Sequence, residues 1–157
     1  MKVSIITINY NSSAYTIKLI ESILKNISNT ILYEIIVTDN ASEKDDYDYL
    51  ISNIPSDTRI KIFRSNINTG FSGGNMDGYN RSSGEYLLFI NNDCECQNDV
   101  LQPLLKFIQN NDNDTVFQNK DFKIILVGEN LKKKQRDTIS KNIFSSLKKK
   151  KPTYICF

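Results

Sequence analysis

A chain of 157 residues is long enough for one domain with a sizeable hydrophobic core and too short for two such domains. Its 20 basic and 18 acidic residues leave a net charge of +2, which gives no reason to expect a nucleic acid partner. Because the sequence contains no histidine, it excludes Ser-His and Cys-His catalysis and any metal site built on histidine.

The cysteines and the hydropathy pattern indicate the cellular compartment. Three cysteines do not form a disulfide framework, and 94–96 lacks the spacing of a zinc knuckle, so we interpret them as free thiols. No apolar run approaches the roughly 18 residues of a membrane span. The chain enters a strand pattern without a signal peptide. We therefore expect a cytoplasmic protein.

Predicted strands and helices alternate along the first part of the chain. Residues 3–8, 34–38 and 60–63 are β-branched and apolar, which favours strands. An amphipathic helix follows the first strand, capped by Ser12 or Ser13, and an acidic helix over about 44–54 follows the second. For the second helix, Ser42 or a neighbour is the expected cap. This order predicts a parallel sheet with right-handed crossovers.

A glycine-rich stretch interrupts the simple repeat. We expect 66–74 to be a loop whose glycines let the backbone approach a ligand, followed by a helix over about 74–82. The loop matches neither the Walker nor the dinucleotide-binding pattern. Because the helix is rich in poor helix formers, we predict that it is positioned for function. An apolar strand over 86–90 and a helix beginning near Asn98, its expected cap, come next.

Beyond residue 110 the pattern weakens, and we predict a boundary between a domain over 1–115 and a basic tail over 116–157. Residues 122–128 could form a strand. Residues 131–151 have a basic helical pattern, which fits a helix docked on the protein or on a membrane surface. The alternative is a solvated, lysine-rich face or tail.

Polar side chains follow three of the predicted strands, at 9–11, 39–42 and 91–93. If the fourth strand lies beside the first, the sheet order is 3-2-1-4 and these clusters meet at the topological switch point. Such a crevice suits a nucleotide with a diphosphate. Asp39 can accept a hydrogen bond from the base, and Asp93 can hold Mg²⁺ or Mn²⁺ together with substrate phosphates. The alternative for 91–93 is a simple turn.

At these residues the chain resembles the inverting glycosyltransferase family 2, in its bacterial rhamnosyltransferase-like branch. The matching segments are 3–11, 34–42, 68–75 and 84–93. The resemblance implies a GT-A fold: an α/β domain with an open, mostly parallel sheet, helices on both faces and a Rossmann-like nucleotide-binding half. It also implies metal-assisted transfer of a sugar from a UDP- or dTDP-sugar to a glycan or lipid-linked acceptor, as in cell-wall or polysaccharide biosynthesis.

The same resemblance implies roles for single residues. Asp39 would contact the uracil or thymine ring, Asp93 would hold the cation, and Asn68, Gly70 and Asn75 would shape the sugar side. The full set of implied donor-binding residues is Thr7, Asn9, Asn11, Asp39, Asn40, Ser42, Asn68, Gly70, Asn75, Asn91 and Asn92. Two positions depart from the family pattern: Asn91 replaces a possible first aspartate, and Met76 replaces a second asparagine.

The family's general base lies downstream of its metal motif, where this chain offers only Asp121 and Glu129, in surroundings that match no family motif. We therefore leave the catalytic base unassigned and expect a short form, produced by truncation, frameshift or divergence. Two alternatives to an inverting hexosyltransferase stay open. One is a catalytically incomplete nucleotide-sugar-binding module, and the other is a different nucleotidyl-type α/β enzyme that shares only the sheet.

Overall fold

The computed structural model describes residues 2–110, 116–118 and 123–125. Its main sheet contains four parallel strands in the order β3-β2-β1-β4, as predicted. Their bounds are β1 Lys2–Asn9, β2 Leu32–Asp39, β3 Ile60–Arg64 and β4 Tyr86–Phe89. β1 and β2 pair in register up to Asn9 and Asp39. The two polar strand ends therefore lie next to each other.

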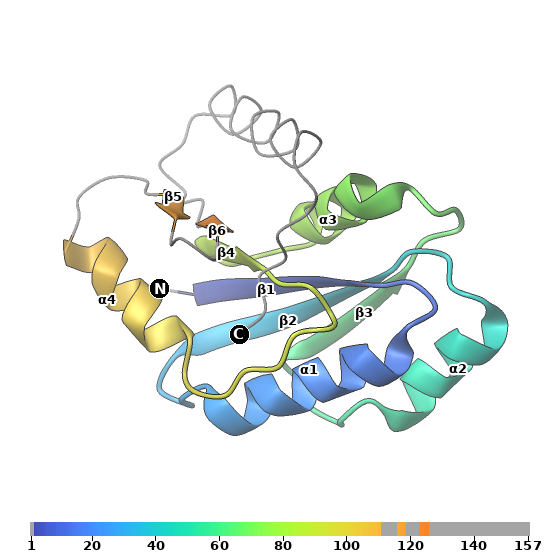
Figure 1. Ribbon diagram of the computed structural model, residues 1–157, viewed down its shortest axis with the longest axis horizontal. Helices are drawn as coiled ribbons and strands as arrows, with labels where there is room; N and C mark the ends of the chain where they lie inside the picture. The colour runs from blue at the N-terminus through green and yellow to red at the C-terminus, as the bar shows by residue number, and fades with distance from the viewer. Residues whose placement is uncertain (1, 111–115, 119–122, 126–157) are drawn as a thin grey trace.

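Helices cover both faces of this sheet, which confirms the predicted architecture (Figure 1). Helices α1 (Ser13–Asn26) and α2 (Lys44–Asn53) lie on one face, and α3 (Gly70–Asn80) lies on the other. The larger core lies under α1 and includes Ile5 and Ile35. A smaller core contains Ile6 and Ile36, which point to the α3 face because side chains alternate along a strand. The continuous apolar runs of β1 and β2 reflect this burial on both sides.

The chain continues into α4 (Leu101–Asn110), whose Leu101, Leu104 and Leu105 join the larger core. Strands β5 (Val116–Gln118) and β6 (Lys123–Ile125) form an antiparallel pair. β6 lies within the strand predicted over 122–128. Asp121, Glu129, Cys156 and the basic segment 131–151 lie outside the described residues, and the boundary at 115 stays a prediction. In the described part of the chain, no helix is long and apolar enough to cross a membrane.

The glycine-rich segment is partly helical, which corrects the predicted loop. Helix α3 begins at Gly70, four residues before the predicted start near Gly74. Gly70 has a φ of 72°, so the loop ends in a conformation that favours glycine. Within α3, a Cβ at Gly74 would lie 3.0 Å from Ile8 Cδ1, and one at Gly78 would lie 2.5 Å from Ile6 Cγ2. These glycines let the helix pack closely on the sheet.

Replacing Gly78 by alanine should lower the free energy of unfolding by about 2 kcal/mol, because overpacking of a core outweighs the better helix propensity of alanine. The Ile6 side chain that would collide is fully buried and β-branched, so it has little freedom to move. Urea unfolding measures the effect, with Ser72→Ala in the same helix as control. Equal stability of the two variants would contradict the prediction, because it would show that a methyl group at position 78 fits between α3 and Ile6.

Residues other than the predicted ones cap two of the helices. The Asp99 carboxylate, and not Asn98, accepts hydrogen bonds from the backbone N–H groups of Leu101 and Gln102, at 3.0 Å each. Ser12 occupies the N-cap position of α1, but its side chain makes no capping bond. Instead, Asp46 of α2 accepts from Ser13 N at 3.0 Å. The N-cap of α2 is Glu43, the neighbour of Ser42. Cys94 and Cys96 are buried, and neither of them forms a disulfide with another described residue.

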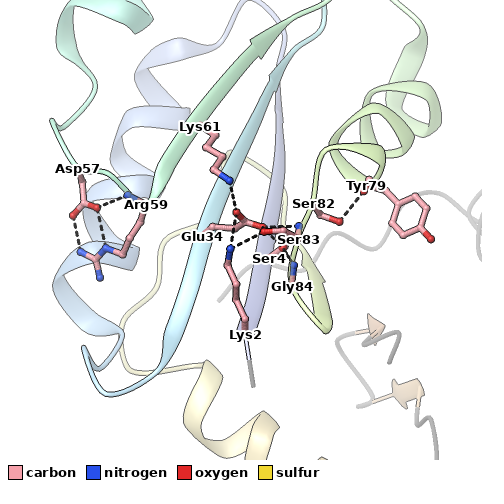
Figure 2. A network of polar contacts seen from close by, with 10 residues as sticks. All are labelled: Lys2, Ser4, Glu34, Asp57, Arg59, Lys61, Tyr79, Ser82, Ser83 and Gly84. Carbon is pink, nitrogen blue, oxygen red and sulfur yellow. Dashed lines mark hydrogen bonds and ion pairs between the residues drawn. The ribbon is translucent and has the colours of Figure 1, made fainter. Parts of the chain in front are cut away.

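A buried glutamate forms hydrogen bonds with neighbouring strands at the amino-terminal half of the sheet (Figure 2). Glu34 of β2 is 2% exposed. Its Oε2 accepts from Lys2 Nζ at 3.1 Å and from Lys61 Nζ at 2.8 Å. Its Oε1 accepts from Ser4 Oγ at 2.6 Å and from the backbone N–H of Ser83 at 2.7 Å. One carboxylate therefore connects β1, β2, β3 and the turn between α3 and β4.

The hydrogen bonds of Glu34 outweigh the cost of its burial. Burial raises the pKa of this carboxyl, but the bonds from Lys61, Ser4 and Ser83 lower it by a larger amount. The resulting pKa lies well below its usual range. The neighbouring turn is equally tight, because Gly84 N donates to Ser4 Oγ at 2.8 Å. A Cβ at Gly84 would lie 2.6 Å from the backbone nitrogen of Ser4. This network holds β4 beside β1.

Candidate functional site

A cleft of about 440 Å³ opens at the carboxyl ends of the strands, a size typical of small-molecule sites. It lies where β1 is flanked by β2 and β4, the topological switch point at which open α/β sheets bind ligands. The cleft is lined by Ile8, Tyr10, Ser12, Asn40, Asn68, Gly70, Phe71, Asn75, Ile90, Asn91, Asn92 and Asp93.

The structure separates the predicted site residues into two groups. Asn40, Asn68, Gly70, Asn75, Asn91, Asn92 and Asp93 line the cleft. Thr7, Asn9, Asn11, Asp39 and Ser42 do not line it, and all of these except Asn11 are buried. At the ends of β1 and β2 the division follows the alternation of a strand, in which neighbouring side chains point to opposite faces of the sheet. Ile8 and Asn40 line the cleft, whereas Thr7, Asn9 and Asp39 do not.

Five further residues line the cleft that the sequence did not identify as site residues: Ile8, Tyr10, Ser12, Phe71 and Ile90. The aromatic rings of Tyr10 and Phe71 are each 49% exposed. Both residues lie inside segments that carry the family resemblance, and an exposed ring beside a glycine or a polar loop is the signal that could have identified them. Rings in this setting can pack against a base or a sugar.

Asp39 is fully buried behind the cleft and held by three groups. Its Oδ1 accepts from Asn9 Nδ2 at 2.9 Å, and its Oδ2 accepts from Ser42 N at 3.3 Å. Arg64 Nε lies 3.4 Å from the same Oδ2. A carboxylate offers about four acceptor positions, so Asp39 keeps capacity for one further donor. A ligand can use it only if the side chains that cover it move aside.

The loops after β1 and β2 are joined by Asn11 and Ser42. The backbone N–H of Asn11 donates to Ser42 Oγ at 3.0 Å, and Asn11 Oδ1 accepts from Glu43 N at 2.7 Å. Asn11 has a φ of 48°, a conformation that asparagine tolerates. Thr7 is different: it is fully buried in β1, and its hydroxyl has no hydrogen-bond partner among the described residues.

Asp46 is a site-supporting residue that sequence reasoning missed. Its carboxylate accepts from Ser13 N at 3.0 Å and from Asn9 Nδ2 at 3.0 Å. Burial raises the pKa of Asp46, but the bonds from Ser13 and Asn9 outweigh it and lower the pKa below its usual value. The sequence shows only an acidic residue in the first turn of α2. No local pattern reveals that it caps a different helix.

Asn40 lines the cleft, but its side-chain amide is fully used by the opposite loop. Its Nδ2 donates to Asn68 Oδ1 at 2.9 Å and to the carbonyl of Gly70 at 3.2 Å. Its Oδ1 accepts from the backbone N–H and the hydroxyl of Thr69, at 3.0 and 3.2 Å. An amide side chain has two donor and two acceptor positions. Asn40 therefore shapes the wall of the cleft at 68–70.

Asp93 is the exposed carboxylate of the cleft and lies beside Asn91 and Asn92. Among the described residues, no three His, Cys, Asp or Glu side chains gather as a metal site. One carboxylate with neighbouring amide oxygens nevertheless fits Mg²⁺ or Mn²⁺, which commonly takes most of its oxygen ligands from substrate phosphates and water. These residues fit a cation that arrives with its substrate, and they do not form a complete protein cage.

Comparison with known proteins agrees with this geometry. The family model described as "Glycosyl transferase family 2" matches residues 4–157. An uncharacterized glycosyltransferase of Rickettsia bellii (strain RML369-C) is 30% identical over 147 residues, which are 93% of this chain and 20% of that protein. Polypeptide N-acetylgalactosaminyltransferase 11 of Xenopus tropicalis is 31% identical over 114 residues, 69% of this chain and 19% of that protein. The chain thus spans about a fifth of the length of these two relatives.

Solved structures agree on the fold. The structure of S. aureus TarS 1-349 in complex with UDP-GlcNAc has a TM-score of 0.62 at 23% identity, covering 73% of this chain and 33% of that one. The same protein in complex with UDP gives a TM-score of 0.59. The sheet and its flanking helices therefore have the GT-A fold.

Proposed function

The chain belongs to glycosyl transferase family 2, and from this premise we propose that it transfers a sugar from a UDP- or dTDP-sugar to a glycan or lipid-linked acceptor, with inversion at the anomeric carbon. The observation that carries the proposal is the cleft at the switch point, where Asp93 and several amide side chains converge. The relatives add support, since one is a polypeptide N-acetylgalactosaminyltransferase and TarS was solved with UDP-GlcNAc. Membership of the rhamnosyltransferase-like branch remains our prediction.

In this proposal different walls of the cleft bind the base and the sugar of the donor. The base lies beside the exposed ring of Tyr10, in front of the buried Asp39. Asp39 has one acceptor position left, which the base reaches once the side chains that cover the carboxylate move aside. The sugar lies toward Asn68, Gly70 and Asn75 at the start of α3. The donor thus spans from the end of β2 across β1 to the end of β4.

Asp93, with oxygens of Asn91 and Asn92, would hold Mg²⁺ or Mn²⁺ against the diphosphate. The cation supplies neutralisation of the charge that develops on the leaving nucleoside diphosphate. We assign no general base among the described residues. For a lipid-linked acceptor, we place the reaction at the inner face of the membrane, with the basic segment 131–151 near anionic lipid.

Thermal unfolding with UDP, dTDP, GDP and NAD, each with and without Mn²⁺, tests the proposal. UDP or dTDP should raise the melting temperature, and Mn²⁺ should enlarge the increase, because a ligand at about 100 times its dissociation constant adds about 2.7 kcal/mol of stability. GDP and NAD serve as controls for non-specific binding of nucleotides. Equal shifts with all four, or no shift in a cooperatively folding sample, would contradict the proposed donor site.

A further inference from the structure

A chain of hydrogen-bonded side chains runs beneath the cleft from the end of β4 to the end of β2. Asn92 Nδ2 donates to Thr16 Oγ1 at 2.9 Å, and Thr16 Oγ1 donates to Asn9 Oδ1 at 2.8 Å. Asn9 Nδ2 then donates to Asp39 Oδ1 at 2.9 Å. Thr16, Asn9 and Asp39 are fully buried. The chain therefore connects the loop that carries Asp93 with the carboxylate proposed to face the base.

The direction of each bond in this chain is fixed. The Thr16 hydroxyl has one hydrogen, which it gives to Asn9, so toward Asn92 it can only accept. The second amide hydrogen of Asn92 points to Ser12 Oγ at 2.7 Å. Asn9 Nδ2 lies near two carboxylates, since Asp46 Oδ2 is 3.0 Å away. A flipped Asn9 amide would present its carbonyl oxygen to both carboxylates, which is unfavourable.

We propose that Thr16 is a positioning residue for the nucleotide site. It lines no part of the cleft, and it acts by holding the amides of Asn9 and Asn92 in one orientation. Asn9 in turn fixes Asp39, and Asn92 fixes the loop that carries Asp93. Without the Thr16 hydroxyl, the Asn9 oxygen is buried with no donor and the Asn92 amide loses an acceptor, so both ends of the site lose a contact that holds them. This inference rests on the proposed function.

The test compares Thr16→Val, Thr16→Ser and Thr38→Val by calorimetric titration of the full chain with UDP and Mn²⁺. Thr16→Val should weaken UDP binding about tenfold, as is common when a group that supports a ligand-binding residue is lost. Thr16→Ser keeps the hydroxyl and should bind like the unmodified chain. Thr38→Val is the matched control, because Thr38 is also fully buried but its hydroxyl has no partner among the described residues.

Unchanged UDP affinity in Thr16→Val, at whatever cost in stability, would overturn the positioning role. A second readout needs neither a folded variant nor UDP binding. In NMR spectra of the unmodified chain, the hydroxyl proton that Thr16 donates to Asn9 Oδ1 should exchange slowly with solvent, and rapid exchange would overturn the proposal. Failure of the unmodified chain to bind UDP would contradict the proposed function instead, and slow exchange of the Thr16 hydroxyl proton would still support the orienting contact made by Thr16.

Discussion

Replacing Glu34 by glutamine lowers the free energy of unfolding by about 3 kcal/mol, the scale expected when a buried, hydrogen-bonded carboxylate loses its charge beside cationic partners. The substitution keeps the size of the side chain but replaces one acceptor oxygen with a donor. That donor faces either the lysine ammonium groups or the Ser4 and Ser83 donors. Urea unfolding near neutral pH measures the loss, and Glu21→Gln on the exposed face of α1 is the control.

The same variant has a pH signature with a defined sign. The pKa of Glu34 is lower in the folded chain than its ordinary value of 4.5, so its contribution to stability is present above that value. This contribution is lost as the pH falls below 4.5 toward the lowered pKa. The difference in stability between the unmodified chain and Glu34→Gln should therefore shrink on acidification. A difference that stays constant from neutral to acidic pH would contradict the network shown in Figure 2.

Replacing Asp93 by asparagine should abolish the effect of Mn²⁺ on UDP binding and reduce sugar transfer by a factor of about 100 to 1,000, the range for loss of one group that stabilises transition-state charge. Asp93 is the exposed carboxylate of the cleft, and asparagine keeps its shape while removing the charge that attracts a cation. Titration of UDP with and without Mn²⁺ measures the first effect, and release of UDP from a UDP-sugar measures the second.

Glu95→Gln is the matched control for Asp93→Asn. Glu95 lies two residues further on, is also exposed, and does not line the cleft, so its variant changes the net charge equally. It should keep the Mn²⁺ dependence of the unmodified chain. If both variants lose the same amount of affinity, the effect of Asp93 is one of general charge and not of a cation site.

The strand pattern could be predicted from the sequence because burial on both faces produces long apolar runs. Residues 3–8 and 34–38 have this composition, and their polar endings mark the edge where a parallel sheet binds ligands. The order of the strands followed from placing the fourth strand beside the first. The start of α3 was not predictable in the same way, because Gly74 and Gly78 serve close packing against Ile8 and Ile6. That contact appears only once the helix lies on the sheet.

The sequence predicted which residues lie near the site, but not the direction or the partners of their side chains. The motifs identified Asn40 and Asn9 as polar residues at strand ends. In the structure both side chains form hydrogen bonds with other elements of the protein. Asp46 and Thr16 had no signal at all. Their partners lie on other elements, and a hydrogen bond between distant segments leaves no periodicity in a single sequence.

The most direct test of a donor site in this cleft is the anomalous diffraction signal of Mn²⁺ in a crystal of the chain grown with UDP and MnCl₂. We expect an anomalous peak beside Asp93 and the diphosphate, with the uracil ring beside Tyr10 and in front of the buried Asp39. UDP bound elsewhere, or a manganese peak away from Asp93 in crystals that contain UDP, would contradict it.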